Sequence, residues 1–189
     1  MSESILENMK GILFDPTSTF QSLRNETLGE ALKYYAILLL IPTVLITLLF
    51  SVSGIASQDI PGLALMSGMG LFIGIIIFIM GIISVLINGL IYHILGVYIA
   101  GGREGAEQTI KALAYASTPI LLLGWIPIIN LIAGIWTLIL FILGIRELQN
   151  LSTGRAVLVI ILPIVIIAGI IVFSAVISVF IFGMAGSVY

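Results

Sequence analysis

The stretch that decides the fold runs from Ala112 to Ile145 and reads ALAYASTPILLLGWIPIINLIAGIWTLILFILGI. It carries no charge, and as one helix it would be about 50 Å long, against roughly 30 Å for the hydrocarbon core of a bilayer. A Gly-Trp-Ile-Pro run at 124–127 lies near its middle. Gly and Pro interrupt helices, and Trp favours the membrane interface. The stretch therefore predicts two short spans, 110–123 and 127–145, joined by a tight hairpin.

The composition of the whole chain is that of an integral membrane protein. Of its 189 residues 60% are hydrophobic and only 8% are charged, whereas soluble domains carry about 25% charged residues. The formal net charge of -2 gives no basis for binding nucleic acid. The chain has no Cys and one His, which excludes a thiolate nucleophile and any Cys-ligated or His-rich metal site. We expect no cofactor.

Charged residues set off three further uncharged blocks, and each block holds one span of about 20 apolar residues. With five spans and a cytoplasmic N-terminus, all seven Lys and Arg residues lie inside, as the positive-inside rule requires. Splitting the 60–102 block, or fusing the third and fourth spans, would place basic residues outside. The C-terminus and the 53–66 loop then face outside. The sequence predicts an all-α, polytopic membrane helix bundle with transmembrane spans at about 34–52, 71–95, 110–123, 127–145 and 156–182.

Residues 1–33 form a charged cytosolic segment ahead of this 34–189 domain, with no recognisable signal peptide. Apolar residues recur there at helical spacing and predict a short amphipathic helix; they are Ile5, Leu6, Met9, Ile12 and Leu13. Its apolar face either covers the bundle and lipid surface or binds a partner.

Capping signals divide the rest of this segment. Asp15 followed by Pro16 predicts the start of a second helix, with Phe20 and Leu23 on its buried face. We expect Phe14 and Phe20 to anchor the segment to the bundle. Thr27 and a Glu three residues later form a capping-box pattern, which predicts the start of the helix of the first span.

Two stretches resemble motifs of the Yip family of Ypt/Rab-GTPase-interacting membrane proteins. Eukaryotic members carry Asp-Leu-Tyr-Gly-Pro before the first span and Gly-Tyr-x-x-x-Pro in the third. Leu13, Phe14 and Pro16 stand for the Leu, the aromatic residue and the Pro of the first motif. Tyr115 and Pro119 match the second motif. The chain departs from the first motif at Ile12 and Asp15, which replace its Asp and Gly. It departs from the second motif at Ala114, which replaces its Gly.

The resemblance implies five helices, a cytosolic N-terminus and a non-enzymatic role in recruiting partners or shaping membranes. A GTPase-like partner follows from the resemblance alone. The run Gly101, Gly102, Gln108 and Ala114-Tyr115 is similar to prokaryotic members of the family. Together with the high Ile content, it points to a prokaryotic plasma membrane.

Few polar side chains lie at membrane depth, and each is a candidate for function. Ser84, Asn88 and Tyr92 recur every four residues on the second span, and His93 follows. Such a stripe either bonds a neighbouring helix or lines a solute path. Asn130 in the fourth span likewise either bonds a neighbouring helix or lines a solute path. His93 either makes an interfacial hydrogen bond or serves as a proton relay or ligand site.

The sequence thus predicts a membrane protein that is not an enzyme. It would contact the lipid bilayer, recruit a cytosolic or membrane partner, and could form a homo-oligomer. The absence of buried charge favours this function, whereas the stripe on the second span leaves a small-solute transporter or channel as the alternative.

Overall fold

The computed structural model describes residues 2–56 and 61–186, with side chains described for 4–52 and 69–178. These residues are almost entirely helical and contain no strand, as the sequence predicted. Residues 57–60 of the predicted outer loop and the C-terminal Tyr189 lie outside the described residues. In chain order the elements are α1 (Ser2–Phe14), α2 (Pro16–Leu23), α3 (Leu28–Ala56), α4 (Pro61–Tyr92), the π-helix η1 (His93–Val97), α5 (Tyr98–Ala100), α6 (Ala106–Ala116), α7 (Thr118–Leu123), α8 (Pro127–Leu148) and α9 (Thr153–Gly186).

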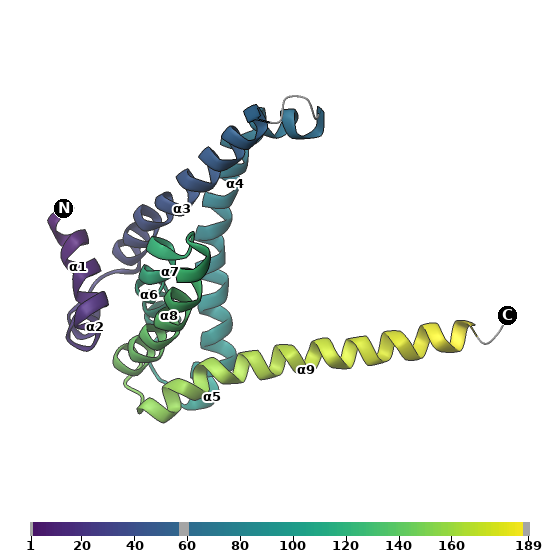
Figure 1. The fold of residues 1–189 in the computed structure, drawn as a ribbon. Coiled ribbons are helices and arrows are strands. Elements are labelled where there is room, and N and C mark those ends of the chain that lie inside the picture. Colours follow the sequence, from purple (N-terminus) through teal and green to yellow (C-terminus); the bar gives the residue numbers. More distant parts are fainter. Residues whose placement is uncertain (1, 57–60, 187–189) are drawn as a thin grey trace.

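Helices α3 and α4 form a long antiparallel hairpin, and α6, α7 and α8 pack beside it (Figure 1). Small residues bring the two hairpin helices together. A methyl group on Gly74 would collide with the Thr47 side chain, and one on Gly70 with the Ser51 hydroxyl. Because the Thr and Ser hydroxyls bond to carbonyls of their own helix, the contact leaves no hydroxyl donor unused in the membrane.

Within the described residues, four helical stretches are long and apolar enough to cross a membrane: Leu28–Val52, Met69–Ala100, Pro127–Leu148 and Thr153–Ser178. They coincide with the first, second, fourth and fifth predicted spans. The second continues to Ala100 through the π-helix. The third predicted span, 110–123, is not one such helix, because the chain divides it between α6 and α7.

The division between α6 and α7 has a local cause at Pro119. Proline has no backbone N–H and so cannot donate to the carbonyl of Tyr115, four residues earlier. The Thr118 hydroxyl donates to that carbonyl instead, at 2.6 Å. The Ser117 backbone N–H and hydroxyl both donate to the Leu113 carbonyl. The Leu113 and Tyr115 carbonyls at the break therefore keep partners, as low-dielectric surroundings require.

The N-terminal helices pack against the bundle rather than extending from it (Figure 1). Helix α2 begins at Pro16, as predicted, and both Phe20 and Leu23 are buried. The capping box is confirmed: the Thr27 N–H donates to the Glu30 carboxylate at 2.8 Å, and the Glu30 N–H to the Thr27 hydroxyl at 3.3 Å. The expectation that Phe14 helps to anchor the segment is wrong, since its side chain is 84% exposed.

Helix α9 contacts the bundle only through its first half. The π-helix η1 brings Gly96 so close to Val159 of α9 that a methyl group there would collide with the Val159 backbone. From 167 to 178 every described side chain is exposed, and Figure 1 shows this part extending away from the other helices. Ser174 and Ser178 donate to carbonyls of their own helix, so they do not join α9 to another element of the described chain.

Candidate functional site

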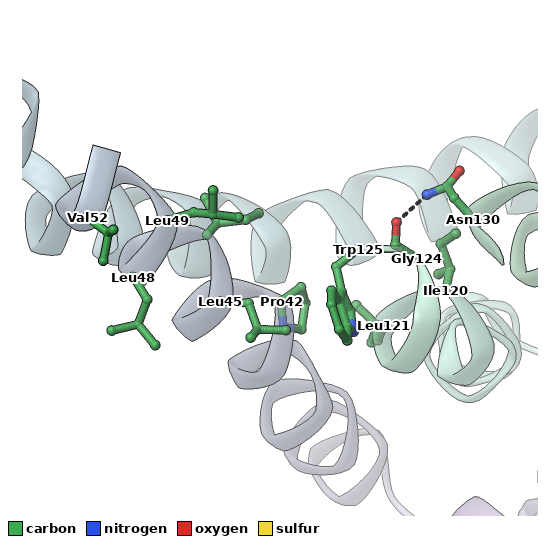
Figure 2. Close-up of a pocket in the computed structure, with 11 residues that line it drawn as sticks. Pro42, Leu45, Leu48, Leu49, Val52, Ile120, Leu121, Gly124, Trp125 and Asn130 are labelled. Atoms are coloured by element: carbon green, nitrogen blue, oxygen red, sulfur yellow. Dashed lines mark hydrogen bonds between the residues drawn. The ribbon is translucent and has the colours of Figure 1, made fainter. Parts of the chain in front are cut away.

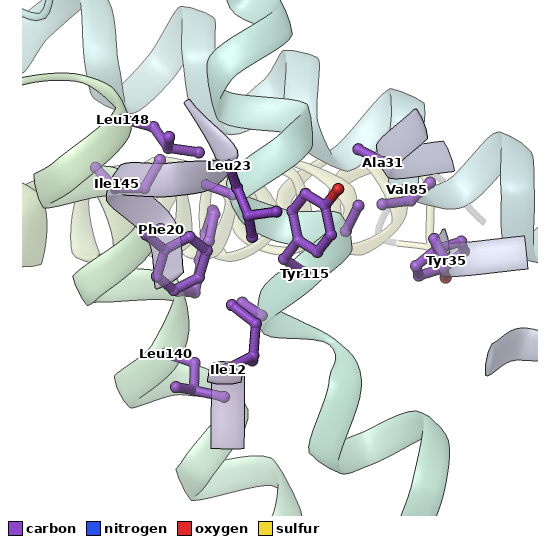
Figure 3. Close-up of a cluster of buried hydrophobic side chains, with 14 of the residues drawn as sticks. Ile12, Phe20, Leu23, Ala31, Tyr35, Val85, Tyr115, Leu140, Ile145 and Leu148 are labelled. Atoms are coloured by element: carbon purple, nitrogen blue, oxygen red, sulfur yellow. The ribbon is translucent and has the colours of Figure 1, made fainter. Parts of the chain in front are cut away.

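Ile12, from the first family-motif stretch, and Tyr115, from the second, belong to one buried cluster (Figure 3). Tyr115 on α6 is fully buried and lies near Leu23 of α2. The Phe20 ring packs closely against α8, because a methyl group on Gly144 would lie 2.9 Å from it. Leu13 and Pro16, from the first motif, are half-buried at the junction of α1 and α2. The cluster thus joins the N-terminal segment to the bundle.

Tyr115 also makes the main polar contact of this junction. Its hydroxyl donates to the carboxylate of Glu26, in the turn between α2 and α3. Its ring packs against Tyr34 of α3, with the ring centroids 4.8 Å apart. A small cavity of about 170 Å³ lies beside these groups, and Asn8 of α1 lines it. Four segments of the chain therefore meet at one tyrosine.

Lys111 is the buried cation of the site, and sequence reasoning missed its role. The residue is fully buried, and its ammonium donates to the carbonyls of Arg24 at 2.8 Å and Glu26 at 2.6 Å. The amide of Gln108 also donates to the Arg24 carbonyl, at 3.3 Å. These carbonyls follow the C-terminus of α2, where cations are favourable. Lys111 therefore fastens α2 to α6.

A polar network at the surface holds three chain segments together. The Arg24 guanidinium donates to the Glu104 carboxylate at 2.9 Å and to the Asn150 amide oxygen at 2.8 Å. The Asn150 amide in turn donates to Glu104 at 2.9 Å. Arg146 and Glu147 of α8 add contacts to Thr17 and Gln21 of α2. We call this side of the molecule, formed by α2, the 101–105 loop and the C-terminal end of α8, the charged end.

His93 takes part in a half-buried network rather than in an open site. Its Nδ1 lies 3.0 Å from the Thr109 hydroxyl, which accepts a hydrogen bond from the Gln149 amide at 2.9 Å. The Gln149 amide also donates to the Gly105 carbonyl. The network joins η1, α6 and the end of α8. No group of three metal-ligating side chains occurs among the described residues.

The predicted polar stripe does not connect α4 to a neighbouring helix of the same described chain. The Asn88 amide donates to the carbonyl and the hydroxyl of Ser84, at 2.8 and 3.1 Å, and both side chains are exposed. Tyr92 turns inward and packs edge-on against Phe141 of α8, at 4.9 Å between centroids. The structure therefore separates Ser84 and Asn88 from the interior of the bundle.

A groove of about 760 Å³ lies between α3 and the tip of the α7–α8 hairpin (Figure 2). Trp125 lies beside Pro42, and Leu45, Leu49 and Val52 continue the apolar wall. The Asn130 amide, predicted to bond a neighbouring helix, instead donates to the Gly124 carbonyl within the hairpin, at 2.5 Å. The lining contains no acid, base or nucleophile suited to chemistry on a substrate.

The outer face of α1 combines an exposed aromatic ring with charge. Phe14 is 84% and Leu6 is 52% exposed. Both line a shallow hollow of about 550 Å³ together with Glu7, Lys10 and Asp15. An exposed Phe on a helix whose other face is docked is a candidate contact for another molecule. We call this the α1 outer face.

One comparison with known proteins identifies a relationship. The family model of the Yip1 domain matches residues 10–187, nearly the whole chain. No curated protein and no solved structure matches the chain.

Proposed function

The chain belongs to the Yip1 domain family, and we propose that it is a non-enzymatic, five-pass membrane protein that recruits a cytosolic protein through the α1 outer face. Family membership and the four long apolar helices make it a multi-pass membrane protein. The number of passes, the orientation and the recruiting role are parts of the proposal.

A parity argument supports α6 and α7, the third predicted span, as an additional crossing that brings the total to five. The end of α8 lies on the same side of the molecule as the 101–105 loop, because Gln149 bonds Gly105 and Asn150 bonds Glu104. If both Met69–Ala100 and Pro127–Leu148 cross, the segment between them must cross in the opposite direction. Helices α6 and α7 extend over 106–123, which is roughly 27 Å at 1.5 Å per residue. This approaches the thickness of the hydrocarbon core.

Cysteine labelling tests the number of passes and the orientation. The chain has no Cys, so single Cys residues at Arg103, Arg155 and Ile128 give unambiguous signals. An impermeant thiol reagent applied to intact cells should label position 128 alone. Labelling at 103 or 155 would show that the proposed topology is wrong, and failure at 128 in protein that is labelled after solubilisation would show that α6 and α7 do not cross.

The observation that carries the recruiting role is the exposure of Phe14 on a docked helix. Ile12 of α1 is fully buried, so the helix is held in place while Phe14 points away. The α1 outer face carries both signs of charge, through Glu7, Lys10 and Asp15. A surface for anionic lipids would be dominated by Lys and Arg, whereas mixed charge suits complementary contact with a folded protein.

The transporter alternative loses the observation that supported it. Its candidate path was the stripe of Ser84, Asn88 and Tyr92. Ser84 and Asn88 lie on the outside of the bundle, and Tyr92 packs against Phe141. The groove between α3 and the hairpin tip is apolar. No specific observation in the described residues favours solute transport.

A photoreactive phenylalanine analogue at position 14 tests the recruiting role in living cells. The matched control is position 128, where Ile is also 84% exposed but lies at the hairpin tip. We expect a discrete protein adduct from position 14 alone. The adduct should weaken when Lys10 is changed to Glu and when salt is added to isolated membranes, because exposed charge pairs are screened. Adducts with lipid only would contradict recruitment and indicate that α1 lies on the bilayer.

A further inference from the structure

Ser84 and Asn88 form an exposed polar pair at membrane depth that is not fully hydrogen-bonded. The Asn88 amide N–H groups are used by the Ser84 carbonyl and hydroxyl. Among the described residues, none donates to the Asn88 amide oxygen, and the Ser84 hydroxyl donates to none. The Asn88 amide oxygen therefore remains as a free acceptor and the Ser84 hydroxyl as a free donor. The two residues are a helical turn apart on the same exposed face of α4.

The position of the pair makes water an unsuitable partner. Asn88 lies about 18 Å along the helix axis from Ala100, at 1.5 Å per residue. The span continues beyond it as far as Met69. The pair thus lies near the middle of a core about 30 Å thick. Lipid chains offer no hydrogen bond, and an unsatisfied polar group in hydrocarbon is costly.

Four other exposed or half-buried hydroxyls in the spans are arranged differently. Thr47, Ser51, Ser174 and Ser178 each donate to a carbonyl of their own helix. They therefore require nothing from outside the chain. Ser84 differs from these four residues, because its hydroxyl accepts from Asn88 and donates to no described residue. The Thr137 hydroxyl of α8 also has no partner, but it is buried within the chain and faces no second copy.

We propose that the α4 face around Ser84 and Asn88 binds the same face of a second copy of this chain. Two copies inserted in the same orientation are related by an axis along the membrane normal, so Asn88 of each lies at the same depth. Because the Asn88 N–H groups are already used, the Ser84 hydroxyl of each copy can donate across that axis to the Asn88 amide oxygen of the other. Ser84 is small enough to allow the helices to approach closely. The surface is thus complementary to itself.

The flanking side chains are suited to such a contact. Met80 and Ile87 are 56% and 51% exposed and would surround the polar pair with apolar contact. Neither Ser84 nor Asn88 belongs to the buried junction of the N-terminal segment. The contact between copies therefore leaves the charged end and the α1 outer face free.

Disulfide crosslinking in native membranes tests the proposal. Ser84→Cys is nearly isosteric and introduces the only Cys in the chain. The matched control is Ile83→Cys, since Ile83 is 40% exposed on the same helix and points about 100° away. On oxidation, Ser84→Cys should give a covalent dimer of this chain, and Ile83→Cys should give little. Equal crosslinking, or a disulfide to a different protein, would overturn the proposal.

Subunit counting in bilayers provides the second measurement. Asn88→Leu should weaken dimerisation about 5- to 30-fold, the factor that corresponds to a 1–2 kcal/mol interhelical hydrogen bond. Asn88→Gln, which keeps the amide, should retain most of the dimer. An unchanged monomer–dimer equilibrium in Asn88→Leu, with the variant correctly inserted, would show that the polar pair does not hold two copies together.

Discussion

Truncating Phe20 should release the N-terminal segment while leaving the membrane spans intact. The Phe20 side chain has no exposed surface and packs against Gly144 of α8. Replacing a fully buried Phe by Ala costs about 3–5 kcal/mol. Each 1.4 kcal/mol is a factor of about ten, so the population with the segment undocked should rise about 100- to 4,000-fold.

Trypsin digestion in lipid nanodiscs measures this population. Lys10 lies in α1 and Arg24 just after α2, so cleavage at either requires local opening. When opening and closing are fast relative to cleavage, the cleavage rate follows the open population. Phe20→Ala should therefore be cut much faster than the parent, up to the rate of an unstructured peptide. Helix content measured by circular dichroism should change little, because the spans are unaffected.

Phe14→Ala is the matched control, because it removes the same group from the same segment. Its side chain is 84% exposed and contributes little to docking. Phe14→Ala should be cleaved at the parent rate. Equal cleavage of the two variants would refute the reasoning, since it would show that burial of Phe20 does not hold the segment in place.

Three further substitutions test the contacts around this junction. Gly144→Val should displace the Phe20 ring and speed trypsin cleavage at Arg24. Gly134→Val should not, because nothing lies within 4 Å of a Cβ added there, and equal effects of the two variants would contradict the Phe20 contact. Lys111→Met should speed the same cleavage about 5- to 150-fold, because an unsatisfied buried carbonyl costs about 1–3 kcal/mol, and parent-like cleavage would show that Lys111 does not fasten α2. Gly96→Ala should lower the thermal midpoint of the purified protein relative to Gly134→Ala, through collision with the Val159 backbone, and equal midpoints would exclude that contact.

The long apolar elements were predictable because their signals are local. The length of the uncharged blocks indicated where α3, α4, α8 and α9 lie. Two helix starts were predicted from capping signals, namely Asp15-Pro16 and Thr27 with Glu30. The exposure of Phe14 could also have been predicted from a helical wheel. Phe14 follows Ile12 by two residues and therefore lies about 200° around α1, on the face opposite the buried side chain.

The buried polar contacts could not be predicted, because their acceptors are not side chains. Lys111 bonds the carbonyls of Arg24 and Glu26, which every residue possesses and no sequence pattern marks. Lys111 lies near the start of the third predicted span, 110–123. Its burial depends on the approach of α2, which itself depends on Phe20 fitting beside Gly144. That fit is a property of packing between distant segments.

The spacing of Tyr115 and Pro119 has a physical explanation in these contacts. A proline releases the carbonyl four residues earlier, and that carbonyl belongs to Tyr115 itself. Thr118 satisfies it, and Tyr34 of α3 lies 2.8 Å from the Thr118 hydroxyl. Because Thr118 donates to the carbonyl, the Tyr34 hydroxyl must be the donor to Thr118. One helical break thereby links α3 to α6, while the Tyr115 hydroxyl binds Glu26. The motif joins the spans and the N-terminal segment through a single residue, so loss of Pro119 should disturb both contacts together.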